Sequence, residues 1–183
     1  MFFFEILSIN RNRNFLNFLV LVFLVNVSLL ILPSGIFASD LTMADKVIIE
    51  KEKRRLHLLN NNKIIKSFSV ALGLSPLGHK QYEGDSKTPE GSYFLDGRNQ
   101  NSDFFLSIHV SYPNSTDIQA AKNNDLSPGG EIMIHGQPNN PIYPDVYYET
   151  KDWTNGCIAV SNGDMMDIWM TIPDMKIPID ILP

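Results

Sequence analysis

From Lys46 onward, short runs rich in β-branched, leucine and aromatic residues alternate with turn residues, and this pattern restricts the fold more than any other feature of the chain. Such runs predict strands, and they occur at Lys46–Glu50, Arg55–Leu59, Ile64–Leu72, Ser92–Leu95, Phe104–Val110, Glu131–His135, Ile158–Val160 and Lys176–Leu182. The asparagines at 60–62 predict a hairpin turn between the second and third runs. The pattern therefore indicates a mainly β domain.

Helical patterns are few. Asp117–Asn124 predicts one short helix. A second helix is expected after Ser161, which together with Asp164 resembles an N-terminal capping box. Its apolar face is formed, at helical spacing, by Met165, Met166, Ile168, Trp169 and Ile172. Since 183 residues suffice for one compact domain and hardly for two, we expect residues 40–183 to form a single β-sandwich-type domain with one or two helices.

Two long segments have no clear period and are expected to be loops. Gly73–Pro89 is rich in glycine, proline and charged residues, and Pro138–Asp152 contains three prolines and three tyrosines. Loops of this length are often functional. The second loop either forms a lid or wall of a cleft, or is a connection whose tyrosines pack on the core.

The first 39 residues differ from the rest of the chain. Arg11 and Arg13 precede an apolar run, Phe15–Leu32, and small residues near Ala38 follow it. This order is typical of a signal peptide, and the run is also just long enough for a membrane anchor. A buried core helix is a third interpretation. We favour cleavage near Ala38, and both membrane interpretations place the chain from Asp40 outside the cytoplasm, in the periplasm or cell envelope.

Charge and histidine spacing argue against two classes of function. The net charge is −5 and the pI is about 5.3, so no basic surplus indicates nucleic-acid binding. His57, His79 and His109, together with His135 and the single cysteine, have none of the short spacings of zinc ligands. We therefore expect neither a nucleic-acid partner nor a metal or other cofactor.

The single cysteine, Cys157, cannot form an intrachain disulfide, so in an exported domain it is either buried or functional. It follows Gly156, which allows backbone N–H groups to converge on one point, as an oxyanion requires. A thiol needs a nearby base or cation for activation, and His135, which ends an apolar strand before Gly136, is a candidate base. The alternative is that both are ordinary core residues.

Three stretches occur together in this chain: Lys87-Thr88-Pro89-Glu90-Gly91, Ile132-Met133-Ile134-His135-Gly136 and Asp152-Trp153-Thr154-Asn155-Gly156-Cys157-Ile158-Ala159-Val160. In this order they resemble the L,D-transpeptidase catalytic domain (YkuD-like) family, over about Lys46 to Pro183. The segment Phe104–Asn114 is similar to a branch of the family that carries the last of these motifs. The resemblance implies a YkuD-like β fold.

The resemblance also implies roles for individual residues. Cys157 matches the nucleophile, and His135 matches the general base, oriented by the carbonyl of the next residue, Gly136. The backbone N–H groups of Gly156 and Cys157 match the oxyanion hole, to which Asn155 can also contribute. Asn155 stands where the family often has histidine, and Ala159 where it often has arginine or asparagine. Substrate contacts are therefore less well defined than the nucleophile.

The function implied by the resemblance is cleavage of peptidoglycan stem peptides through a Cys157 thioester, with transfer to an amine acceptor for cell-wall crosslinking or remodelling and cell shape. The alternatives are hydrolysis of the same stems and a non-catalytic wall-binding module. Thr154, His109 and Tyr112 are further candidates for substrate contacts. The sequence leaves the acceptor and the oligomeric state open.

Overall fold

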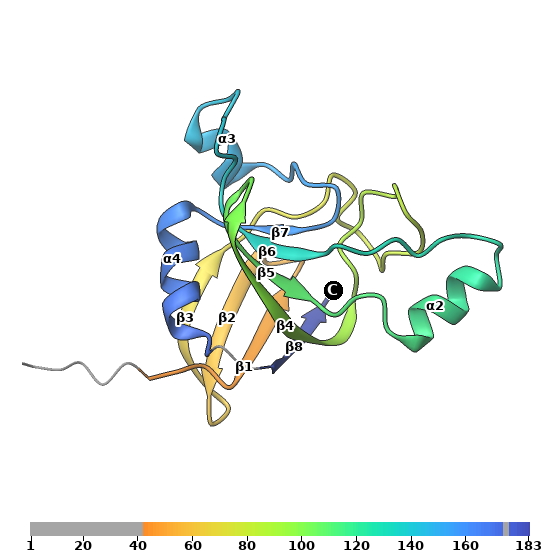
Figure 1. Cartoon of the computed structure of the whole chain (residues 1–183), viewed down its shortest axis with the longest axis horizontal. Helices are drawn as coiled ribbons and strands as arrows, with labels where there is room; N and C mark the ends of the chain where they lie inside the picture. Colours follow the sequence, from red (N-terminus) through yellow and green to blue (C-terminus); the bar gives the residue numbers. More distant parts are fainter. Residues whose placement is uncertain (1–41, 174–175) are drawn as a thin grey trace, which may run out of the picture. The chain divides into compact units, whose positions relative to one another are not determined.

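The computed structural model describes residues 42–173 and 176–183, which form a mainly β domain (Figure 1). The segment predicted to be a signal peptide or membrane anchor, residues 1–39, lies outside this range. The strands are β1 (Lys46–Glu50), β2 (Arg55–Asn60), β3 (Lys63–Ser69), β4 (Gly91–Ser102), β5 (Phe105–Val110), β6 (Met133–His135), β7 (Ile158–Ala159) and β8 (Ile177–Leu182). The helices are α2 (Ser115–Lys122), α3 (Asp145–Thr150) and α4 (Asn162–Thr171). Within the described range, no helix combines the length and apolar character needed to cross a bilayer.

All eight strands belong to one curled sheet in the order β3-β2-β1-β8-β4-β5-β6-β7. Most neighbours are antiparallel, but β8 runs parallel to β1, and β7 runs parallel to β6. The predicted hairpin between β2 and β3 is present. Its two loop residues, Asn61 and Asn62, have φ angles of 50° and 61°, a left-handed conformation that asparagine tolerates better than most residues.

A further pair of hydrogen bonds joins the two edges of the sheet. Ala71, just beyond edge strand β3, exchanges backbone hydrogen bonds of 2.8 Å with Ala159 in edge strand β7. Gly73 then forms a bridge with Thr154. Because an unpaired edge leaves backbone groups unsatisfied, this contact partly closes the sheet. It also brings the segment after β3 against the segment before β7.

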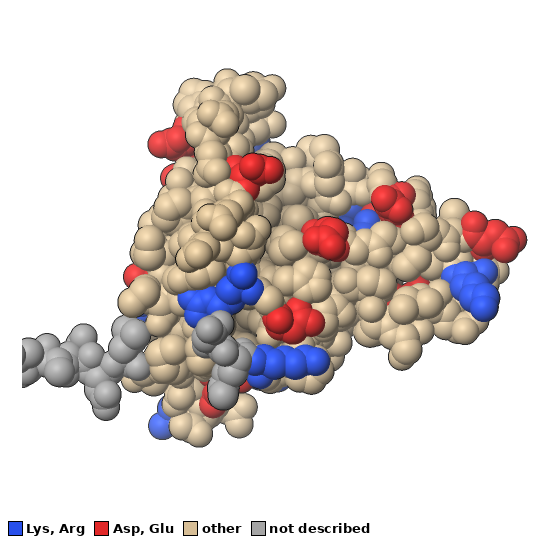
Figure 2. Space-filling view, in the orientation of Figure 1, with Lys and Arg blue, Asp and Glu red and all other residues tan. Residues whose placement is uncertain are grey.

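The core lies inside the curl, and helix α4 covers part of it. Alternate residues of β1, β8 and β2 point inward and are fully buried, among them Val47, Ile49 and Ile179. Helix α4 adds Met165 and Ile168, and the Ser161 side chain caps its start by accepting a hydrogen bond from the backbone of Asp164. On the face in Figure 2, positive and negative side chains are interspersed.

The mainly β fold expected from the sequence is confirmed, and two local predictions differ from the structure. The described residues contain three helices rather than one or two, because α3 lies in Pro138–Asp152, which we predicted to be a loop. Six residues are too few to give a helical period. The second difference is the length of β4, which continues to Ser102, far beyond the predicted Leu95. Its second half is polar and largely exposed, so it lacks the apolar alternation of a strand.

Candidate active site

A cleft of about 390 Å³ opens beside β6 and the start of β7. It contains the predicted nucleophile and base, together with two neighbours predicted from the motif. Its lining is formed by Asn99, Asn101, Ser102, Asp103, Phe104, Ser107, Glu131, Met133, His135, Trp153, Thr154, Asn155 and Cys157. The structure therefore brings together side chains that lie more than twenty positions apart in the sequence.

The pairing of β6 with β7 places His135 and Cys157 on neighbouring parallel segments. Ile134 is the register partner of Ile158, and both side chains are fully buried in the core. Because side chains alternate along a strand, His135 and Cys157, on either side of this pair, point away from the core and line the cleft.

His135 is held in a defined tautomer. Its Nδ1 lies 2.7 Å from the carbonyl oxygen of Gly136, which can only accept, so Nδ1 carries the proton and Nε2 is left as the acceptor. The rings of Phe104 and Trp153 pack on the imidazole, with centroid distances of 4.6 and 5.6 Å. Burial lowers the pKa of His135 to about 4, against the smaller opposing effect of the Gly136 hydrogen bond. The imidazole is thus a neutral, oriented base.

Cys157 is a free thiol that is also held in its neutral form. Burial raises the pKa of Cys157 and the charge of Glu131 raises it further, whereas a hydrogen bond from the backbone of Met133 and the charge of Lys80 lower it. Sγ lies 3.5 Å from the carbonyl oxygen of Glu131, a weak S–H donor contact. In the free protein, the proton therefore stays on sulfur.

The turn before Cys157 is held by the Thr154 hydroxyl group. This hydroxyl accepts a hydrogen bond from the Gly156 N–H at 3.1 Å and donates one to the Cys157 carbonyl at 2.8 Å. The predicted oxyanion donor Gly156 is thus directed to Thr154 in this structure. Gly156 has a φ of +131°, which favours glycine. Thr154, predicted as a substrate contact, therefore has a clear part in shaping the turn.

The Lys87–Gly91 motif lies directly behind this turn. Thr88 is fully buried, and its hydroxyl oxygen accepts a hydrogen bond of 3.2 Å from the Gly73 N–H. Gly73 lies so close to Gly156 that a Cβ built on Gly73 would be 3.1 Å from the Gly156 Cα. The motif thus packs against the turn before Cys157 from outside the cleft.

Two predicted substrate contacts lie outside the cleft. His109 in β5 has its Nδ1 2.6 Å from Asp96 Oδ1. Tyr112 is buried against Tyr93 and donates a hydrogen bond to the Pro128 carbonyl. Ala159, where the family often has a polar residue, is buried, and its backbone forms the bridge that joins the sheet edges.

Several residues of the cleft were not predicted from the sequence. Asn99, Asn101 and Asp103 reach it because β4 extends beyond its apolar part. Glu131 was only part of a predicted strand, but it lies outside β6 with a left-handed φ of 54°. A polar tail following an apolar strand was the only available signal for the first three.

The segment containing α3 packs on the aromatic side of the cleft. Tyr148 is buried, and its ring lies 5.2 Å from that of Trp153, whose indole N–H donates to the Tyr148 carbonyl. The Tyr148 hydroxyl accepts hydrogen bonds from the backbone of Ile142 and Tyr143. This tyrosine therefore supports a wall of the cleft. Among residues 42–173 and 176–183, no three His, Cys, Asp or Glu side chains are placed to hold a metal ion.

The family model of the L,D-transpeptidase catalytic domain, YkuD, matches residues 44–181. The chain belongs to this family. The YkuD match covers almost all of the described domain, including β1, the cleft and β8. The two motifs that contribute His135 and Cys157 both lie inside it.

Named relatives agree with the family assignment. "Putative L,D-transpeptidase YafK" of Escherichia coli (strain K12) is 33% identical over 95 residues, which is 48% of this chain and 36% of YafK. The crystal structure of the helical cell shape determining protein Pgp2 from Campylobacter jejuni aligns with a TM-score of 0.57 and 27% identity, over 75% of this chain and 47% of Pgp2. Bd1075 of Bdellovibrio bacteriovorus shares the fold at a TM-score of 0.51 and 24% identity, over 78% of this chain and 51% of Bd1075. The chain thus spans about a third to a half of these proteins.

Proposed function

We propose that this protein is a peptidoglycan L,D-transpeptidase in which Cys157 is the nucleophile and His135 the general base. The observation that carries the proposal is the arrangement of the pair: His135 has its Nδ1 fixed on the Gly136 carbonyl and its Nε2 left as acceptor, in the same cleft as the chain's single thiol. Members of the family act on peptidoglycan stem peptides.

The first half of the proposed reaction forms a thioester. His135 Nε2 takes the proton from Cys157 Sγ as the sulfur attacks the carbonyl carbon of a stem-peptide bond. Backbone N–H groups at Asn155 and Cys157 stabilise the oxyanion of the tetrahedral intermediate. When the intermediate collapses, the C–N bond breaks, and the leaving D-amino acid takes the proton from the imidazolium.

The second half releases the acyl group. An amine acceptor attacks the thioester carbonyl, His135 takes its proton, and the thiol is restored when the C–S bond breaks. Water in place of the amine gives hydrolysis. The outcome thus depends on how well the cleft excludes water, to which the aromatic wall of Phe104, Trp153 and Tyr148 contributes.

Because His135 and Cys157 are both neutral in the free protein, proton transfer between them is expected to be concerted with attack on the substrate. Burial lowers the pKa of His135 to about 4 and raises that of Cys157, so a separated thiolate–imidazolium pair is unfavourable in the free protein. Proton transfer then accompanies attack on the substrate, where the oxyanion donors stabilise the new charge. A thiol that stays protonated is also less exposed to oxidation, which suits an unpaired cysteine in an exported domain.

The test is incubation of the purified protein with a disaccharide-tetrapeptide, followed by mass spectrometry. We expect a crosslinked dimer that lacks one terminal D-amino acid. Cys157→Ser and His135→Asn should abolish it, whereas His109→Asn, a histidine outside the cleft, should retain it. Monomeric tripeptide alone would indicate a hydrolase. No product, and no covalent adduct of Cys157 with a carbapenem, would refute both enzymatic functions and leave a wall-binding module.

The proposed function also predicts the localisation of the domain, because its substrate lies outside the cytoplasm. We propose export to the periplasm or cell envelope, directed by the apolar segment Phe15–Leu32. Cell fractionation followed by N-terminal sequencing tests it: the mature chain should start near Ala38 or keep the segment in the membrane fraction. Recovery of the full-length chain only from the cytosol would contradict it.

A further inference from the structure

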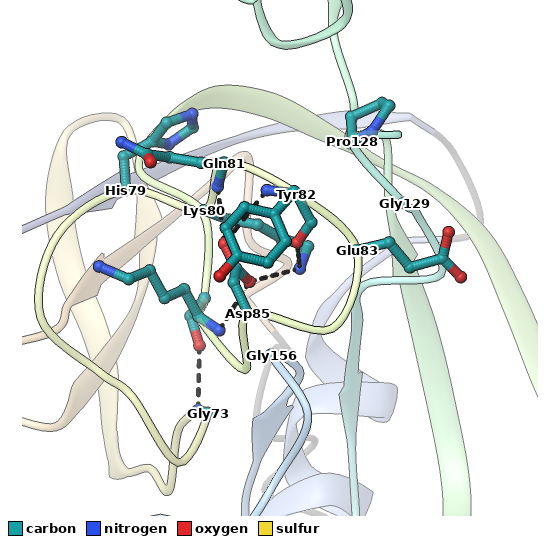
Figure 3. A network of polar contacts seen from close by, with 12 residues as sticks. Gly73, His79, Lys80, Gln81, Tyr82, Glu83, Asp85, Pro128, Gly129 and Gly156 are labelled. Carbon is teal, nitrogen blue, oxygen red and sulfur yellow. Dashed lines mark hydrogen bonds and ion pairs between the residues drawn. The ribbon is translucent and has the colours of Figure 1, made fainter. Parts of the chain in front are cut away.

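A buried ion pair lies behind the nucleophile turn, within the segment 73–90 that links β3 to β4 (Figure 3). Lys80 Nζ lies 2.7 Å from Asp85 Oδ1, and the two side chains are only 4% and 3% exposed. Lys80 also donates a hydrogen bond of 2.9 Å to the Tyr82 carbonyl. Burying two charges costs several kcal/mol per ion, so a buried pair is weak evidence of stabilisation by itself. Its place in the molecule therefore needs another explanation.

Asp85 is held by more than its partner. Oδ2 accepts backbone hydrogen bonds from Gln81 at 2.8 Å and Tyr82 at 3.2 Å, and Oδ1 accepts one from Lys87 at 3.0 Å. Burial alone would raise the pKa of Asp85, but the hydrogen bonds from Lys80 and these backbone groups hold it below its ordinary value. The carboxylate therefore stays charged and fixes the backbone around it.

The backbone that Asp85 fixes is the backbone that packs on the nucleophile turn. A Cβ built on Gly156 would lie 2.6 Å from the Lys87 carbonyl oxygen, and one built on Gly73 would lie 2.2 Å from that of Ser86. Figure 3 shows Gly73 and Gly156 below the segment that contains the pair. Gly156, on which this backbone packs, directly precedes Cys157 in the sequence.

Lys80 also acts on the Cys157 thiol through its positive charge. Lys80 lowers the pKa of Cys157, in opposition to burial and to the carboxylate of Glu131. The other groups near the thiol are the backbone N–H of Met133, and the neutral imidazole of His135 and the side chain of Asp103, which line the same cleft. The positive charge of Lys80 thus favours the thiolate.

We propose that the Lys80–Asp85 ion pair is a positioning element of the nucleophile: Asp85 holds the 85–88 backbone against Gly156, and Lys80 supplies a buried positive charge for the developing thiolate of Cys157. Neither residue touches the substrate. The effect on turnover rests on the proposed transpeptidase function, whereas the effect on the thiol does not.

Lys51 provides a matched control. It is a second buried lysine that anchors the same segment, since its Nζ binds the carbonyls of Gly78 and Thr88 at 2.7 and 2.9 Å and the Glu90 carboxylate at 2.8 Å. Lys80→Gln and Lys51→Gln both remove a buried charge and leave an N–H donor, the glutamine amide, in its place. Only the first removes the charge that acts on Cys157.

The experiment is the pH profile of alkylation of Cys157 by iodoacetamide in the full-length chain, whose single cysteine makes the signal unambiguous. We expect Lys80→Gln to move the profile to higher pH and to slow alkylation at pH 8, because the charge of Lys80 lowers the pKa of Cys157. Lys51→Gln should keep the wild-type profile even where urea unfolding shows lower stability. Lys80→Arg should restore the profile. Equal shifts in both glutamine variants, or no shift in either, would overturn the proposal.

Two further readouts make every outcome informative. If Lys80→Gln does not fold, Lys80→Arg becomes the deciding variant. Because it keeps the positive charge, a shift of its alkylation profile away from that of the wild type would overturn the proposal. With the disaccharide-tetrapeptide, Lys80→Gln should lower kcat and leave KM near wild type. If the wild type gives no product while the alkylation profile still shifts, the proposed function fails and the positioning of the thiol stands.

Discussion

Replacing Gly156 by alanine tests how the turn before Cys157 is built. Its φ of +131° lies in a region that is essentially restricted to glycine, which costs an alanine about 1–3 kcal/mol. The added Cβ would also lie 2.6 Å from the Lys87 carbonyl oxygen and 3.3 Å from Ile132 Cδ1. The carbonyl belongs to backbone held by Asp85, so it cannot move freely, and displacing it costs about 1–3 kcal/mol more. We expect a total loss of about 4 kcal/mol in the free energy of unfolding.

Two other glycines separate the two causes. Gly84 has a φ of +83° with nothing within 4 Å of an added Cβ, so Gly84→Ala measures conformational strain alone, about 1 kcal/mol. Gly73 has no positive φ, but its Cβ would lie 2.2 Å from the Ser86 carbonyl oxygen, so Gly73→Ala measures the collision alone.

The assay is urea unfolding of the three variants, followed by the fluorescence of Trp153 and Trp169. We expect Gly84→Ala to lose least, and Gly73→Ala and Gly156→Ala both to lose more, with m-values near that of the wild type. If Gly156→Ala lost no more than Gly84→Ala, the close packing of Lys87 on the turn would be wrong. The positioning role inferred for Asp85 would then lose its route to Cys157.

Three further predictions follow from individual contacts. Because burial lowers the pKa of His135 to about 4 from 6.5, the unfolded chain binds more protons between these values. The free energy of unfolding should therefore fall as the pH decreases from 6.5 towards 4. The loss should be about 3 kcal/mol larger than in His135→Asn, as measured by urea unfolding across this range. Glu131→Gln removes a charge that raises the pKa of Cys157, so iodoacetamide should alkylate the thiol faster at pH 8. Asp152→Asn weakens the contacts to Arg54 and to the Leu72 N–H, and should lower the free energy of unfolding by about 1–2 kcal/mol.

The parts of the fold that could be predicted from sequence are those set by local patterns. Strands β1 and β8 alternate buried positions with less buried ones, so their apolar period is visible along the chain. The Ser161 cap and the apolar face of α4 were likewise local. The end of β4 and helix α3 were missed because neither has a visible apolar period: the second half of β4 is polar and largely exposed, and α3 has only six residues.

The candidate site could also be predicted from the sequence only in part. Cys157 and His135 could be named from residue chemistry and motif, and the structure places both in one cleft. Sequence could not show that the Gly156 N–H is directed to Thr154, or that His109 is paired with Asp96. Both depend on the direction of a single group, which a residue type does not determine.

His135 ends β6 and Cys157 directly precedes β7, and these two strands are the shortest of the sheet. β6 has three residues and β7 has two, so local propensity contributes little to either. β6 is positioned by its pairing with β5, whereas β7 and the turn before it are also held by three further contacts: the Ala71–Ala159 bridge, the Gly73–Thr154 bridge and the Lys87 carbonyl against Gly156. All three come from the segment between β3 and β4. The segment between β3 and β4 therefore helps to fix the geometry of the site. Substitutions in this segment should alter the reactivity of Cys157 although its residues do not line the cleft.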